Sequence, residues 1–141
     1  MKTFKSIIIG IIVLSFVNVN SQSLTSKQLD KKNNKVMLFT VQEYSNLHLW
    51  FYNNVQDMVL SNDVEEQYSY IISKYTYKMS RLDDKDSLLN PEEIRTQMTD
   101  YIQKMNEDSK PILSQDQYRI HKRIMDGLQE RIFEKLDLKY S

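Results

Sequence analysis

The chain has 141 residues, with 19 Lys and Arg, 19 Asp and Glu, and no cysteine. This length fits one domain. Disulfides are excluded, and the balanced charge argues against a dedicated nucleic-acid binder, which would carry a basic excess. Only two glycines and two prolines are present. So few turn-forming residues disfavour an all-β fold.

Residues 1–21 have the pattern of a secretory signal peptide. A short basic start (1–5) precedes an apolar run over residues 7–17, and Val19 and Ser21 occupy the −3 and −1 positions of a possible cleavage site. The run has about 11 residues, whereas a membrane span needs roughly 20. We therefore expect cleavage rather than an anchor, a periplasmic or secreted location, and a mature protein that does not span a membrane. Lys2 and Lys5 of the signal peptide are lost on cleavage, so the mature chain has 17 Lys and Arg against 19 Asp and Glu and a net charge near −2.

The mature chain begins with a polar segment, residues 22–35, for which we expect a frayed helix or a tail. Apolar residues at helical spacing then predict four helices within a domain spanning 36–141. The first predicted helix could reach back to Ser26. The expected spans are about 36–58, 62–82, 91–109 and 115–136. Short connectors would make neighbours antiparallel, so we predict an all-α domain of four antiparallel helices.

The start of the last helix has a clear boundary signal. Pro111 ends any helix that arrives from upstream. A Ser or Thr followed three residues later by Gln can form a capping box, in which each side chain bonds the backbone amide of the other residue. The Leu before the Ser or Thr can pack against the first turn of the helix. This motif occurs twice, in the residues Leu24, Thr25, Gln28, Leu113, Ser114 and Gln117. A related start, Asn90 to Glu93, has proline at the first helical position.

The sequence contains no arrangement of residues that points to catalysis. His48 and His121 lack nearby partners for a zinc site, which needs three or four ligands, and we expect ordinary imidazoles on helix surfaces or at interfaces. No catalytic triad ordering, P-loop or glycine-rich phosphate loop is present. We predict neither an enzyme nor a bound cofactor or metal. Gly127, inside the last helix, marks either a weak spot of about 1 kcal/mol or a place where another backbone approaches closely.

Aromatic residues lie outside the apolar stripes as well as on them. Such residues indicate a second buried face, for example in a dimer, or a surface that binds other proteins. The six methionines of the mature chain would add adaptable apolar surface. Alternatively, Met and Tyr fill a core that is short of Leu and Ile. The residues predicted for a protein-binding surface are Trp50, Tyr52, Met58, Tyr70 and Tyr77.

The two capping motifs also suggest a family. Residues 24–28 match the pattern Leu-Thr-x-x-Gln, and residues 113–117 match it with Ser in place of Thr. An exported, cysteine-free, helical chain with this motif resembles the Spy/CpxP-like periplasmic proteins. The region 47–138 also resembles small exported helical proteins of the Bacteroidetes type.

The resemblance implies an ATP-independent periplasmic chaperone or an envelope-stress protein. It implies antiparallel helical dimers with a concave binding face, and unfolded or envelope proteins as partners. A structural protein of the envelope, with one fixed partner or as a homodimer, is the second possibility that the sequence leaves open. A metal-responsive envelope protein is the third.

Overall fold

The computed structural model describes residues 24–34 and 38–141. In this part of the chain the regular structure is all helical, with no strand. The prediction of an all-α protein is confirmed. The predicted signal peptide, residues 1–21, lies outside the described residues. Six helical elements are present: α2 (Ser26–Asn34), α3 (Val41–Gln56), α4 (Asn62–Met79), α5 (Pro91–Ser109), the 3-10 helix η1 (Lys110–Ile112) and α6 (Gln115–Tyr140).

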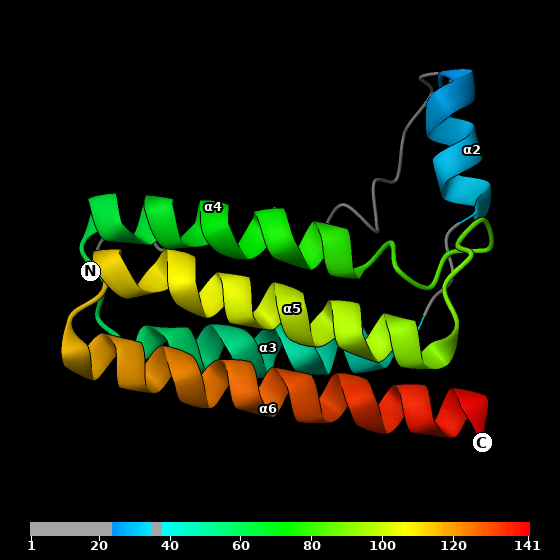
Figure 1. Ribbon diagram of the computed structural model, residues 1–141. Coiled ribbons are helices and arrows are strands. Elements are labelled where there is room, and N and C mark those ends of the chain that lie inside the picture. Colours follow the sequence, from blue (N-terminus) through cyan, green and yellow to red (C-terminus); the bar gives the residue numbers. More distant parts are fainter. Residues whose placement is uncertain (1–23, 35–37) are drawn as a thin grey trace.

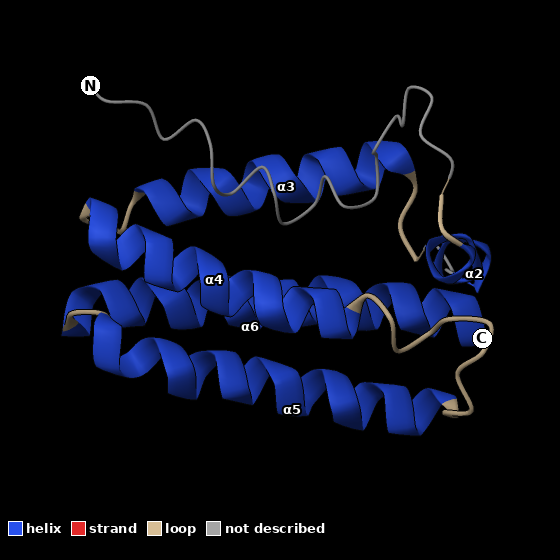
Figure 2. Cartoon of the chain, turned by 90° about the horizontal axis from the view of Figure 1, so that it is seen from above, coloured by secondary structure: helices blue, strands red, loops and turns tan. Residues whose placement is uncertain are grey.

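Helices α3 to α6 lie side by side along one direction, and each runs opposite to the helix before it (Figure 1). Figure 2 shows α3 on one flank, α5 on the other, and α4 and α6 between them. Helix α2 stands away from this group and meets it at the connector between α4 and α5. There the backbone amide of Lys85 donates to the carbonyl of Asn34 at 2.8 Å. This connector, residues 80–90, is longer than the short connectors that the sequence predicted.

Three of the bundle helices begin with a capping box, in which the first and fourth residues hydrogen-bond each other's backbone amides. At α6, the amide of Ser114 donates to Oε1 of Gln117 at 2.9 Å, and the amide of Gln117 donates to Oγ of Ser114 at 3.3 Å. Asn90 and Glu93 form the same pair at α5. The box at α3 is made by Thr40 and Glu43 and was not predicted.

That unpredicted cap corrects the first predicted helix. The expected span of about 36–58, with an extension to Ser26, is replaced by two separate helices, α2 and α3. Helix α3 ends at Gln56, and the chain then turns through Val59, whose φ is +47°. A β-branched residue is strained in this left-handed region. The second predicted helix is also shorter than expected, because α4 ends at Met79.

The core is formed by the inward faces of α3 to α6, and it is rich in methionine and isoleucine. Apolar spacing of three and four residues places one buried side chain per turn on each helix. The buried apolar residues are Phe39, Phe51, Val55, Met58, Tyr68, Ile72, Tyr75, Met79, Ile94, Met98, Ile102, Met105, Ile124, Met125, Leu128, Ile132 and Leu136. Each contributes about 1.5–3 kcal/mol when fully buried.

Gln117 connects the start of α6 to the end of α3. Its Oε1 completes the capping box, and its Nε2 donates to the carbonyl of Met58 at 3.0 Å. Gln28 forms the same local box with Thr25 on α2, where the amide of Thr25 donates to Oε1 of Gln28 at 2.9 Å. The same capping motif therefore links two helices at α6, whereas at α2 its hydrogen bonds stay within the first turn of one helix.

We expect Gln117→Ala to lower the free energy of unfolding by about 1–2 kcal/mol, since both the cap and the bond to Met58 are lost. Urea denaturation followed by circular dichroism measures this loss. Gln28→Ala is the matched control and should change the midpoint little, because α2 stands away from the bundle. Equal losses in the two variants would show that the bond to Met58 contributes nothing.

Candidate functional site

Trp50 packs inside the protein instead of projecting from it. Its indole lies over Gly127 of α6, where an added Cβ would come within 3.0 Å of Cζ2 and 3.2 Å of Cη2. Arg131 covers the ring, with its guanidinium carbon 4.0 Å from the ring centre, and its Nη1 donates to the carbonyl of Gly127 at 2.9 Å. Gly127 is therefore a place of close approach, by a side chain and not by another backbone.

Met58 is part of the core and is 3% exposed, so a partner cannot touch it on the folded surface. Every methionine among the described residues is buried in the same way. Met1 and Met37 lie outside the described residues. The alternative in which methionine fills the core therefore describes these side chains. No adaptable methionine surface exists on the described part of the molecule.

Tyr70 and Tyr77 are the predicted surface residues that the structure leaves open to solvent. They are 71% and 44% exposed and lie on the outer side of α4. Seven residues span close to two helical turns, so the two rings share one face. Leu49 of α3 is a further exposed apolar residue, at 59%, and Tyr52 of α3 is half-buried against the core. These four side chains form the candidate site, which we call the α3–α4 rim.

His121 lies at the centre of the bundle and is fully buried. The hydroxyl of Tyr68 on α4 lies 2.9 Å from its Nδ1, and Oδ1 of Asn106 on α5 lies 3.0 Å from its Nε2. An amide oxygen only accepts, so Nε2 carries the proton and Nδ1 accepts from the Tyr68 hydroxyl. The neutral imidazole thus joins α4, α5 and α6 through one polar network.

Burial controls the ionisation of this network. It lowers the pKa of His121 to about 4, with a smaller contribution from the charge of Lys122 and an opposing one from Asp126. Burial also raises the pKa of the Tyr68 phenol. The ring of Tyr118 stacks on the imidazole, with centres 5.7 Å apart. Both ring nitrogens are used, so His121 is a structural residue with no free position for a metal.

Charged residues at the outer edges form pairs between helices. Lys135 of α6 pairs with Glu43 of α3, and this ammonium holds the pKa of the Glu43 carboxyl at about 2. Lys74 and Tyr75 of α4 both bond Asp108 of α5, the tyrosine hydroxyl at 2.7 Å. Such exposed pairs contribute little individually, and they orient the helices rather than form a reaction centre.

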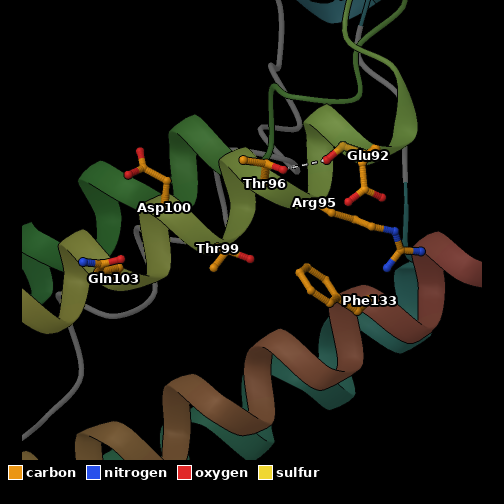
Figure 3. A pocket seen from close by; sticks show the side chains of 7 residues that line it. All are labelled: Glu92, Arg95, Thr96, Thr99, Asp100, Gln103 and Phe133. Atoms are coloured by element: carbon orange, nitrogen blue, oxygen red, sulfur yellow. Dashed lines mark hydrogen bonds between the residues drawn. The ribbon is translucent and has the colours of Figure 1, made fainter.

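A shallow pocket lies between α5 and α6 (Figure 3). The guanidinium of Arg95 lies 5.3 Å from the ring centre of Phe133 and also pairs with Asp137. Asp100, on the same wall, binds Lys104 at 2.6 Å. The charges of Arg95 and Asp100 are thus already paired, and the hydroxyl of Thr96 donates to the backbone carbonyl of Glu92 at 3.0 Å. The residues around the pocket are Glu92, Arg95, Thr96, Thr99, Asp100, Gln103 and Phe133.

The described residues hold no group of three or more His, Cys, Asp or Glu side chains positioned to bind a metal ion. None of the described helices combines the length and the apolar character that a membrane crossing requires. Comparisons with protein-family models, curated proteins and solved structures found no match to this chain.

Sequence reasoning did not find the polar partners inside the core. The expectation of a surface imidazole is wrong for His121, which is fully buried. Its spacing from the apolar residues Met125 and Leu128 of the last predicted helix was a signal for burial. Nothing local identifies Asn106 or Tyr68 as its partners, because the three residues come from three helices. The unpaired buried hydroxyl of Ser69 on α4 was missed for the same reason.

We predict that the stability contributed by neutral His121 is present above its unfolded pKa of about 6.5. It is lost as the pH falls from about 6.5 to about 4, because the unfolded chain takes up the proton first. The loss is on the order of 3 kcal/mol. Urea denaturation at a series of pH values should show this slope in the wild-type protein and a shallower one in His121→Gln. His48→Gln, the control at the other histidine, should keep the full slope. A slope unaffected by His121→Gln would contradict the buried neutral imidazole.

Proposed function

We propose that this protein is an exported helical binding protein of the Spy/CpxP-like kind, an envelope-stress protein that captures unfolded chains without ATP as a chaperone does. In this proposal residues 1–21 direct export and are removed, and helices α3 to α6 act as one antiparallel four-helix bundle in the periplasm or outside the cell. The protein would be neither an enzyme nor a nucleic-acid binder.

The observation that carries the proposal is the exposure of large apolar side chains on the α3–α4 rim. The rings of Tyr70 and Tyr77 stay 71% and 44% exposed although other side chains fill the core. Exposed aromatic side chains that are close together support binding of other proteins. Trp50 and Met58, which were predicted for the same surface, are engaged within the fold and are not part of this proposal.

The test compares Tyr70→Ser/Tyr77→Ser with the wild-type protein in slowing the aggregation of heat-denatured citrate synthase, followed by light scattering. We expect the double variant to need about ten times as much protein for the same effect, since each aromatic contact contributes about 0.5–1.5 kcal/mol. Tyr140→Ser, which removes an exposed ring at the end of α6, is the control and should act as the wild type does. A wild-type protein that does not slow aggregation at equimolar amounts would refute the proposal.

A homodimer is the second candidate, and the charge pattern of α3 favours it. The outward side of this helix bears no charged residue, and Glu43, its one carboxylate, is paired with Lys135. A neutral face can meet a copy of itself without repulsion, and charged residues are depleted at interface centres. The exposed residues of this face are Val41, Gln42, Ser45, Asn46, Leu49 and Asn53.

If this face forms a dimer, Asn46→Glu/Asn53→Glu places like charges across the two-fold axis and should raise the dissociation constant at least tenfold. Multi-angle light scattering over a concentration series measures the mass. Gln103→Glu on the exposed side of α5 is the control and should leave the mass unchanged. A wild-type mass equal to one chain at all concentrations would exclude the dimer.

A further inference from the structure

Helix α3 is held to the bundle mainly along α6. Its indole at Trp50 packs on Gly127, and Glu43 pairs with Lys135. Helix α4 packs chiefly on α5 and on η1 and makes few close approaches to α3. No ion pair among the described residues links α3 to α4. Figure 2 shows α3 and α4 as neighbouring helices. Among the described residues, the seam between these two helices is therefore the least firmly held joint of the bundle.

Buried polar atoms without partners face this seam. Helical periodicity places His48 and Gln56 on the side of α3 that turns from α6 toward α4, and it places Ser69 on the side of α4 that turns toward α3. Nδ1 of His48, Nε2 of Gln56 and Oγ of Ser69 are buried and have no hydrogen-bond partner in the described part of the chain. Ser69 is 2% exposed as a whole residue. Each such atom costs free energy that a bound partner would recover.

The rest of the α4 wall is lined with hydroxyl groups. Ser73 and Thr76 follow Ser69 along this side of the helix, and each hydroxyl donates to a carbonyl of its own helix at 2.7 Å. The α3–α4 rim, with Leu49, Tyr70 and Tyr77, lies along the outer edge of the same seam by the same periodicity. Unpaired polar atoms inside and apolar side chains at the edge would suit a ligand that has both polar and apolar groups.

We propose that α3 separates locally from α4 and that the seam opened in this way takes an extended, uncharged segment of an unfolded polypeptide. Its backbone amides and carbonyls would supply the partners that Ser69, His48 and Gln56 lack. A helix from a second copy cannot do this, because its backbone groups are bonded within the helix, and a lipid tail has no such groups. Helix α3 has 16 residues and is about 24 Å long, so about seven extended residues would span it. This proposal rests on the function proposed above and names its site.

The test uses a fluorescein-labelled peptide of about eight uncharged residues, alternating Thr and Val, and measures binding by fluorescence anisotropy. We expect Ser69→Ala to unfold at a higher urea concentration than the wild type, because an unpaired buried hydroxyl is removed. The same change should weaken peptide binding about fivefold, since one hydrogen bond to the ligand is lost. Ser109→Ala is the matched control, because its buried hydroxyl on α5 also lacks a partner among the described residues. It should gain stability and bind the peptide as the wild type does.

A second measurement locates the peptide without relying on either serine. Because the chain has no cysteine, Ser73→Cys and Gln103→Cys can each carry a single benzophenone label. Irradiation should cross-link the peptide to the label at position 73 and not to the label at position 103, which lies beside the pocket on α5.

Equal peptide binding by Ser69→Ala and Ser109→Ala, or equal cross-linking at the two labels, would overturn the seam as the site. The wild-type protein could then still slow the aggregation of citrate synthase, and the proposed function would stand without this site. Failure of the wild type in that assay would overturn both.

Discussion

The fold depends on one buried imidazole. His121 accepts from Tyr68 of α4 and donates to Asn106 of α5, so it fixes the relative position of three helices whose other buried contacts are mainly apolar. Apolar packing that relies on methionine allows several registers at similar free energy, because this unbranched side chain adapts to different neighbours. A buried polar network does not, since a shifted register leaves its members unpaired. The network thus selects one arrangement of α4, α5 and α6.

Helix α3 is held by different contacts. Its only tryptophan lies on Gly127, and its capping box includes Glu43, which also reaches Lys135. The end of α3 is tied to α6 by Gln117 and then turns through Val59 in a strained conformation. Helix α4 packs chiefly on α5 and approaches α3 closely at few places. The molecule is therefore a firmly connected group of three helices with a fourth helix attached along one side, and the exposed tyrosines lie at the weaker joint.

Local signals explain how much of this could be predicted from sequence. Capping boxes act within four residues, so the starts of α5 and α6 at Asn90 and Ser114 were predictable. Thr40 and Glu43 carry the same signal, but apolar spacing that continued from Met37 to Met58 obscured it. The place of Trp50 was not predictable, because it depends on which residues of α6 lie opposite. Met58 lay on the predicted apolar stripe, which was a signal for its burial, so its choice as a surface residue was wrong. The partners of His121 depend in the same way on contacts between distant segments.

Native-state hydrogen exchange tests this account most directly. If α4, α5 and α6 form the firm group, their central amides exchange only through global unfolding, while the amides of α3 exchange through a local opening of lower free energy. An unfolded peptide bound in the seam then slows exchange in α3 more than in α5. Amides of α3 and α5 that exchange with the same free energy, with and without peptide, would contradict the account.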